Sequence, residues 1–204
     1  MLFSDSYLTI KTQKETLIKE RGSKFLAFIF PVSNESEVKE HLNGLKKEHP
    51  TANHHCYAWR LGPDKAAFKT NDDGEPANTA GKPILGQIQA NDLTNILVVV
   101  VRYFGGTLLG VGGLISAYRA AAAEVIKVSE IYERFILFEY KVDFNEESIN
   151  LVMRILKESG AKIISHTYET GNAIIFQIKK QNSIKLEENF KELYTSKLKY
   201  LKTL

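Results

Sequence analysis

Alternating apolar and polar positions mark the first part of the chain. Between residues 7 and 32 the alternation is that of β-strands, and it breaks at Arg21-Gly22-Ser23, which indicates a hairpin. The apolar residues then recur at helical spacing, so a helix capped by Ser33 or Asn34 is expected. Pro50 ends that helix because proline cannot continue the hydrogen-bond ladder.

One continuous apolar run stands in the middle of the chain. The segment 96–104 opens with ILVVVV, and such a run predicts a strand that is covered on both faces, in the centre of a sheet. Before this strand we predict a strand over 54–62, a polar loop over 71–79 and a helix that ends near Ala90. After it we predict a helix over 112–128.

A shorter series of elements follows residue 130. FILFEYKVDF reads as a strand, and EESINLVMRILKESG as an amphipathic helix that ends at Gly160. Two strands joined at Thr170-Gly171, a helix and a last strand complete the series. The order βαββαβ is that of the ferredoxin-like unit.

These patterns predict an α+β protein with two domains. The chain has 204 residues, and compact domains most often have about 100–150 residues. We place the domains at 1–130 and 131–204, with no Gly/Pro/Ser-rich linker between them. The first domain is expected to hold a mixed sheet with helices, and the second a ferredoxin-like sheet.

Composition and charge narrow the function classes. The 27 basic and 24 acidic residues give a net charge of +3, which is not the signature of a strong nucleic-acid binder. Cys56 is the single cysteine, so neither an intrachain disulfide nor a CxxC zinc site can form. The N-terminus does not resemble a signal peptide, and the longest aliphatic run is far below the roughly 20 residues that span a bilayer. We therefore expect a cytoplasmic protein with no membrane partner.

The stretch RYFGGTLLGVGGLISAYRAAAA, residues 102–123, contains five glycines before an alanine-rich helix. They are Gly105, Gly106, Gly110, Gly112 and Gly113. The spacing of the first and third resembles GxxxxGK[ST], but Val111 stands where the lysine is required. GxGxxG fails as well, because Ile115 occupies the position of its third glycine.

Two interpretations of this stretch remain open. A glycine loop before a helix N-terminus has the generic geometry of an anion site, and Arg102 would face the same point. Alternatively, Gly112 and Gly113 allow close packing of the alanine-rich helix where no Cβ fits. In that case Gly105-Gly106 supplies a turn with positive φ.

The loop NDDGEP has two interpretations too. Asp72, Asp73 and Glu75 precede a helix, where acidic residues cap the first turn and complement its dipole. Alternatively they form a metal or acid/base site with His54 or His55, but neighbouring strand residues point to opposite faces, so at most one histidine can join. Cys56 is expected to be a small core residue.

Four stretches in this order resemble the YigZ/IMPACT family. They are RGSKF (Arg21–Phe25), HHCYAWRLG (His54–Gly62), DDGEPANTAGKPIL (Asp72–Leu85) and RYFGGTLLGVGGLISAYRAA (Arg102–Ala122). The resemblance covers nearly the whole chain. It implies an Impact-type N-terminal domain, with the fold of domain IV of elongation factor G, and a ferredoxin-like C-terminal domain similar to domain V of that factor.

The resemblance implies a regulatory role without known chemistry. Eukaryotic relatives regulate translation under amino-acid stress by competing for the protein that activates an initiation-factor kinase. The chain departs from the family pattern at three positions. Leu108 and Ser116 stand where a lysine and an arginine are common, and Asn78 stands where glycine is common. The two missing positive charges weaken a phosphate-binding role, because phosphate contacts depend on lysine and arginine.

Two functional hypotheses follow. The first is a non-enzymatic, translation-associated protein that contacts RNA, the ribosome or a regulatory protein partner and needs no cofactor or metal. Its binding residues are expected to be His55, Asp72, Asp73, Gly74, Glu75, Arg102, Tyr103, Gly105, Gly106, Gly110, Gly112 and Gly113. Lysines between 179 and 202 would add positive charge, or would only protect an edge strand.

The second hypothesis is a hydrolase that acts on an anionic substrate. In it, His55 and the acidic loop supply metal ligation or general acid/base groups, and Arg102 holds the substrate. It requires a concave pocket on which these side chains converge.

Overall fold

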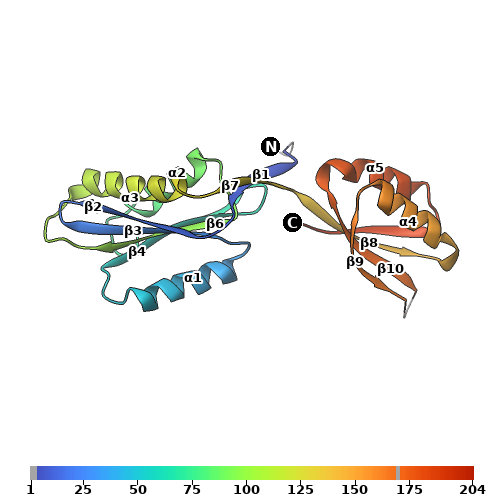
Figure 1. Ribbon diagram of the computed structural model, residues 1–204, viewed down its shortest axis with the longest axis horizontal. Helices are drawn as coiled ribbons and strands as arrows, with labels where there is room; N and C mark the ends of the chain where they lie inside the picture. Colours follow the sequence, from blue (N-terminus) through green and yellow to red (C-terminus); the bar gives the residue numbers. More distant parts are fainter. Residues whose placement is uncertain (1–3, 169–170) are drawn as a thin grey trace. The chain divides into compact units, whose positions relative to one another are not determined.

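The computed structural model describes residues 4–168 and 171–204 of the chain. The chain divides into two compact units, which are described separately below. One unit comprises Tyr7–Arg134, and the other comprises Phe135–Leu204 with residues 4–6. Both units combine helices with sheets, which confirms the α+β class (Figure 1). We keep 1–130 and 131–204 as the proposed domain assignment.

The N-terminal unit is built on a five-stranded sheet with the order β2-β3-β6-β4-β5. Its strands are β2 (Lys14–Glu20), β3 (Ser23–Pro31), β4 (His54–Leu61), β5 (Ala67–Asn71) and β6 (Ile96–Tyr103). All four neighbouring pairs are antiparallel, so the expectation of a mixed sheet is wrong. β6 lies in the centre, as its apolar run predicted, because helices cover both faces of this antiparallel sheet. β5, a short and largely exposed edge strand, was not predicted.

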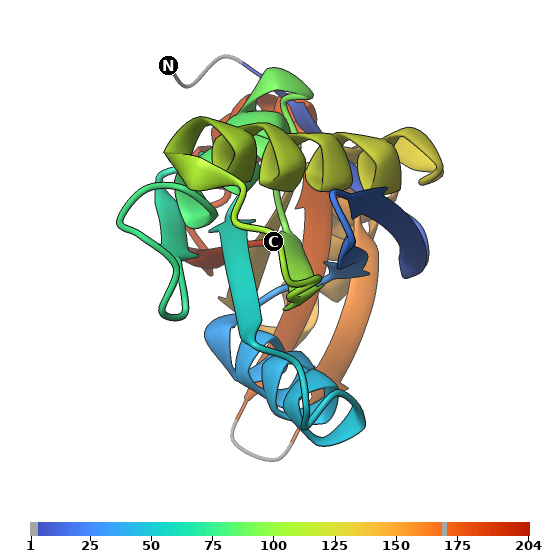
Figure 2. The ribbon, with the colours of Figure 1, turned by 90° about the vertical axis from the view of Figure 1, so that its left-hand side faces the viewer.

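Three helices cover this sheet. α2 (Gly81–Ala90) and α3 (Gly110–Lys127) lie on one face, and α1 (Glu35–Glu48) lies on the other (Figure 2). α1 is capped as predicted, since the Asn34 side chain accepts a hydrogen bond from the backbone N–H of Glu37. α3 begins at Gly110, two residues before the predicted start. β1 (Ser6–Ile10) and β7 (Ile131–Phe135) form a separate two-stranded sheet.

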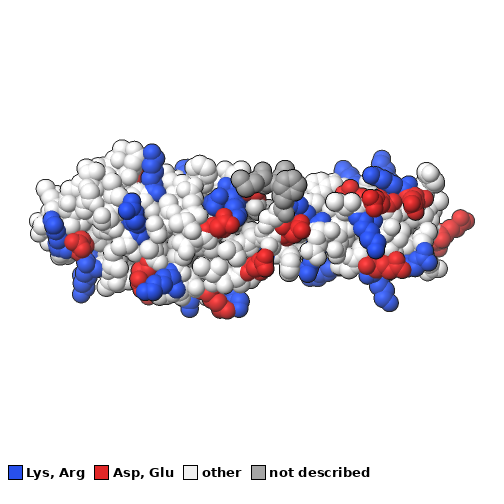
Figure 3. Space-filling view, turned by 90° about the horizontal axis from the view of Figure 1, so that it is seen from above, with Lys and Arg blue, Asp and Glu red and all other residues white. Residues whose placement is uncertain are grey.

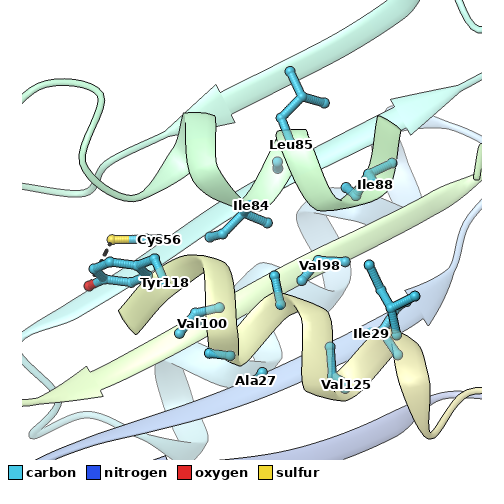
Figure 4. Close-up of a cluster of buried hydrophobic side chains, with 14 of the residues drawn as sticks. Ala27, Ile29, Cys56, Ile84, Leu85, Ile88, Val98, Val100, Tyr118 and Val125 are labelled. Carbon is cyan, nitrogen blue, oxygen red and sulfur yellow. Dashed lines mark hydrogen bonds between the residues drawn. The ribbon is translucent and has the colours of Figure 1, made fainter. Parts of the chain in front are cut away.

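Two apolar cores lie on the two faces of the sheet. Because side chains alternate along a strand, β4 directs Cys56 and Ala58 to the α2–α3 side and Tyr57 and Trp59 to the α1 side. The α2–α3 core includes the small residues of α3 and the large ring of Tyr118 (Figure 4). The predicted role of Cys56 as a small core residue is confirmed, since it is fully buried.

The C-terminal unit contains a four-stranded antiparallel sheet with the order β11-β8-β10-β9. Its elements are β8 (Leu137–Phe144), the 3-10 turn η1 (Glu146–Ser148), α4 (Ile149–Glu158), β9 (Lys162–Thr167), β10 (Asn172–Lys179), α5 (Lys180–Lys191) and β11 (Ser196–Thr203). The predicted βαββαβ order is confirmed, and α4 ends before Gly160, which has a φ of +69°. Thr170, in the predicted turn, lies outside the described residues. Among the helices described, none has the length and apolar composition needed to cross a bilayer.

Candidate binding site at the glycine loop

The glycine loop, residues 104–113, runs from the end of β6 into the first turn of α3. Gly105 lies directly against the turn of the β2–β3 hairpin, where a Cβ would lie 1.9 Å from the carbonyl carbon of Gly22. The backbone N–H of Gly105 also donates to Ser23 Oγ at 3.2 Å. Glycine is therefore required at position 105 by the close approach of two backbones. The two motifs RGSKF and RYFGG, far apart in the sequence, meet at this contact.

The other glycines of the loop do not support the packing expected for them. A Cβ at Gly112 would have no heavy atom within 4 Å, and at Gly113 it would meet only the side chain of Leu109. The expectation that no Cβ fits is therefore wrong for Gly112, whereas at Gly113 a Cβ would lie only 3.0 Å from the Cβ of Leu109. Gly106 and Gly110 have φ values of +87° and +70°, so these two residues supply the turns into α3.

Arg102 and Glu75 form a buried ion pair beneath the loop. Arg102 Nη1 lies 2.6 Å from Glu75 Oε1, and both side chains are about 5% exposed. The Tyr118 hydroxyl donates to the same carboxylate oxygen at 2.7 Å. The guanidinium also lies over the rings of Phe25 and Phe104, at 5.4 and 5.7 Å from their centroids. The charge of Arg102 is thus matched inside the protein rather than presented at the surface.

Asp72 caps α2 with both carboxylate oxygens. Oδ1 accepts from the backbone N–H groups of Ala80 and Gly81, and Oδ2 accepts from that of Asn78. The helix-capping interpretation of the acidic loop, residues 71–79, is confirmed for this residue. Asn78 has a φ of +67°, which glycine and asparagine adopt most readily. This conformation explains why asparagine serves where glycine is common.

The two histidines of β4 point to opposite faces of the sheet, as predicted. His54 lies on the side of the buried ion pair, with Nδ1 2.8 Å from the carbonyl oxygen of Asp73 and Nε2 3.9 Å from Glu75 Oε1. His55 faces α1, and its backbone N–H donates to the Asp73 carboxylate at 2.7 Å. Burial lowers the pKa of His55, while the nearby Asp73 raises it less. His54, rather than the proposed His55, therefore adjoins Glu75.

The predicted binding residues are divided by the sheet. Tyr103 lies on the α1 face, where its hydroxyl is 2.9 Å from His49 Nδ1. Gly74, with a φ of +88°, turns the acidic loop beside the ring of His54. Arg102 and Glu75 lie on the α3 face, and the glycines lie at the adjacent end of the sheet. The predicted set therefore does not form one continuous face.

The residues that hold this region together include several that the sequence did not single out as site residues. Tyr118 is fully buried, and burial raises the pKa of its hydroxyl, so it remains a neutral donor to Glu75. The Cys56 thiol lies 3.0 Å from the carbonyl oxygen of Asp72 and 3.4 Å from the Tyr118 hydroxyl. Burial raises the pKa of that thiol too, which keeps it protonated and a poor nucleophile.

The outer surface of the glycine loop is apolar. Leu108 is 83% exposed, Val111 59% and Phe104 45%. Exposed glycines lie between them, so no side chain covers the backbone there. We call Phe104, Leu108 and Val111 the apolar rim. One feature of the sequence indicated this rim: Leu108 stands at the position where a lysine is common in the family.

The acidic residues give no common centre for a metal ion. Asp72 is engaged with the N-terminus of α2, Asp73 with His55, and Glu75 with Arg102. Within residues 4–168 and 171–204, no three His, Cys, Asp or Glu side chains gather so that they could hold a metal ion. The arrangement therefore stabilises the loops.

Comparison with known proteins agrees with these motifs. The Impact N-terminal domain family matches residues 21–126, which include both loops. The IMPACT family member YigZ of Escherichia coli (strain K12) is 34% identical over 157 residues, 76% of this chain and 77% of that protein. The protein IMPACT homolog of Saccharomyces cerevisiae is 40% identical over 98 residues, 46% of this chain and 37% of that protein.

A solved structure shows the same architecture over the whole chain. It is the crystal structure of a hypothetical protein, with a TM-score of 0.77 and 26% sequence identity. The match covers 98% of this chain and 99% of that chain. The family match spans more than half of the residues, and the relative from Escherichia coli is similar over three quarters of them. This chain belongs to the IMPACT family.

Proposed function

We propose that this protein is a non-enzymatic regulator of translation that binds a protein partner through the apolar rim. Family membership supports the regulatory part of the proposal, since the resemblance to eukaryotic IMPACT proteins implies action on translation through protein–protein contacts. The exposure of Phe104, Leu108 and Val111 supports a protein as the partner and the apolar rim as the surface that binds it. Exposed apolar side chains at one loop are typical of protein-binding surfaces.

The charges around the glycine loop favour a protein partner over a phosphate group. Arg102 is committed to Glu75 in the interior. A common family lysine is replaced by Leu108, so the tip of the loop offers a hydrophobic side chain in place of a cation. On the face of the N-terminal unit drawn in Figure 3, uncharged surface separates the scattered Lys and Arg residues. Strong phosphate binding requires a cluster of such cations.

In this proposal the buried contacts beneath the glycine loop hold the apolar rim in place. Gly105 packs on the hairpin turn, and the Arg102–Glu75 pair joins β6 to the acidic loop beneath the rim. A rim held in one conformation loses little conformational entropy when a partner binds. In this proposal the glycines and acidic residues named from the sequence position the rim, and the three apolar side chains make the contact.

The rim can be tested in a cell-free translation extract. We expect added protein to change the synthesis of a reporter, and the double variant Leu108→Glu/Val111→Glu to require about tenfold more protein for the same change. Phe68→Glu is the matched control, because Phe68 is 54% exposed on the edge strand β5. Equal potency of the wild type and the rim variant would overturn the assignment of the rim, and no effect of the wild type would overturn the regulatory role.

A second candidate, contact with RNA, is favoured by one observation in the C-terminal unit. Lys141 of β8 and Lys199 of β11 are direct cross-strand partners on the sheet face that alternates with the buried core residues. Like charges directly opposite each other are unfavourable, but Lys141 also pairs with Asp143 at 2.7 Å, so the charge left for a bound polyanion is chiefly that of Lys199. The test is RNA binding by filter retention, which we expect to weaken with salt and in Lys141→Glu/Lys199→Glu. Salt-insensitive binding, or no binding, would exclude this candidate.

A further inference from the structure

A groove opens on the α1 face of the N-terminal unit. α1 lies on the opposite side of the sheet from α3 (Figure 2). It lies between α1 and β2 and has a volume of roughly 710 Å³. Its floor is apolar and consists of Phe28 and Phe30 of β3 with Leu45 of α1. The ring of His41 stacks on Phe30, with the two centroids 4.2 Å apart. The volume is sufficient for two or three side chains of a ligand.

One position of α1 beside the groove carries no side chain. Gly44 lines the groove, and a Cβ built there would have no heavy atom within 4 Å. A glycine inside a helix costs about 0.5–1 kcal/mol relative to alanine. Here the backbone approaches nothing closely and φ is not positive, so neither packing nor turn geometry requires the glycine. Gly44 therefore leaves open space next to the aromatic rings of Phe28 and Phe30, as a groove that binds a ligand requires.

The residues around the opening of the groove are mostly acidic, although the chain as a whole is basic. Glu15, Glu40 and Glu48 line the opening together with the single cation Lys14, while the net charge of the chain is +3. In the part of the chain that the structure describes, none of these three glutamates forms an ion pair. Three unpaired carboxylates around an apolar floor complement a ligand that combines positive charge with apolar side chains.

The strand beside the groove, β2, is an edge strand of the sheet. β2 pairs with β3 and is the outermost strand in the order β2-β3-β6-β4-β5. Such an edge offers backbone N–H and C=O groups to an added extended segment. Leu17, on the same face as Glu15 and 50% exposed, continues the apolar surface along β2.

We propose that this groove binds an extended peptide segment of a partner protein that carries lysine or arginine next to aromatic or long aliphatic side chains. The apolar side chains occupy the floor over Phe28 and Phe30, and the cations face Glu15, Glu40 and Glu48. Nucleic acid is disfavoured here because the carboxylates repel phosphates. This site is separate from the apolar rim and does not depend on the translation role.

The proposal can be tested with a synthetic peptide in which lysine alternates with leucine and phenylalanine, seven residues in length. The control peptide has glutamate in place of every lysine. We expect isothermal titration calorimetry to detect the basic peptide only, and backbone amide shifts on binding to fall on β2, β3 and α1. The double variant Glu40→Lys/Glu48→Lys is expected to weaken binding about tenfold, the combined effect of two exposed ion pairs.

Two glycine substitutions, one in α1 and one in α2, distinguish an effect of filling the groove from an effect of lost folding. Gly44→Leu places a side chain in the groove and is expected to abolish peptide binding, whereas Gly86→Leu in α2 is expected to leave it unchanged. A Cβ at either position has open space and leucine favours a helix over glycine, so both variants are expected to fold, which their melting temperatures check. Leu108→Glu should bind the peptide normally.

Four outcomes would overturn the proposal. They are equal binding of the acidic peptide, binding retained in Gly44→Leu, amide shifts confined to elements other than β2, β3 and α1, and competition by single-stranded RNA for the groove. Dimerisation of the wild type that is lost in Gly44→Leu would also contradict it, because the occupant would then be a second copy of the chain.

Discussion

Each unit contains a core tyrosine that donates a hydrogen bond to a glutamate, but the two glutamates differ in their surroundings. In the N-terminal unit, Tyr118 donates to Glu75, whose side chain is 4% exposed and paired with Arg102. In the C-terminal unit, Tyr140 donates to Glu187, which is only half-buried. Among the described residues no ion pair involves Glu187. Burial raises the pKa of both tyrosines, so both remain donors at neutral pH.

The difference shows where a buried charge requires a counter-charge. A carboxylate that can reach water keeps most of its hydration, so one tyrosine suffices for Glu187. A carboxylate enclosed beneath the glycine loop has lost its hydration, and only an equally buried cation can compensate. The sheet of the N-terminal unit is covered on both faces, which encloses Glu75, whereas alternate residues of β8 in the C-terminal unit remain partly exposed.

The largest effect is expected from removing the counter-charge. Arg102→Met leaves Glu75 buried without a cation, and we expect the free energy of unfolding of the N-terminal unit to fall by about 3–5 kcal/mol. Urea denaturation followed by tryptophan fluorescence measures this unit alone, because Trp59 is the single tryptophan and is buried in it.

The control for this prediction is Arg102→Met/Glu75→Gln. Removing both charges should recover most of the lost stability, since the second change eliminates the unpaired carboxylate. If the single variant proves as stable as the double variant, the ion pair does not have the role assigned to it here.

A smaller effect is expected from the backbone contact of the glycine loop. Gly105→Ala places a methyl group against the carbonyl group of Gly22 and should destabilise the N-terminal unit by about 1–3 kcal/mol. Gly112→Ala, seven residues away in open space, should be neutral or stabilise the unit by up to about 1 kcal/mol. Thermal melting followed by Trp59 fluorescence compares the two. Equal melting temperatures would show that the hairpin turn moves away without cost.

The fold was largely predictable because its hydrophobic pattern is regular. The six apolar residues of β6 correctly placed it in the centre of the sheet, and the βαββαβ series was read from periodicity alone. The antiparallel direction of the β2–β3 pair followed from the predicted hairpin. The direction of the pairs made by β6 was not predictable, since a strand buried on both faces has the same pattern in either case. β5 was missed because its residues are mostly exposed and lack an apolar alternation.

The site was predicted less well than the fold. Of the two interpretations left open for the acidic loop, capping holds for Asp72. The opposite orientations of His54 and His55 were predicted correctly, because they follow from strand geometry. It could not show that Arg102 pairs with Glu75, because that contact joins residues 27 positions apart in the chain. The packing role assigned to Gly112 belongs instead to Gly105, whose neighbour Gly22 is known only from the tertiary structure.

The tyrosine–glutamate pairs should differ in strength. Tyr118→Phe removes a donor from an enclosed carboxylate, so we expect the protection of β6 amides from hydrogen exchange to fall by about 1–2 kcal/mol. Tyr140→Phe should reduce the protection of β10 amides by less than about 1 kcal/mol, because water replaces the lost donor at Glu187. Equal losses would mean that exposure does not distinguish the two glutamates.

The smallest effect concerns the pH dependence of the N-terminal unit. Burial lowers the pKa of His55 below its ordinary value of 6.5, so the folded state binds this proton less readily than the unfolded state. The contribution of His55 to stability is therefore complete above pH 6.5 and is lost as the pH falls through that value towards the folded pKa. We expect the melting temperature reported by Trp59 to decrease between pH 7.5 and 5.5, and to decrease less in His55→Gln. The backbone hydrogen bond from residue 55 to Asp73 should survive in the variant, because it does not involve the imidazole ring. If both proteins show the same pH dependence of the melting temperature, that dependence belongs to groups other than His55.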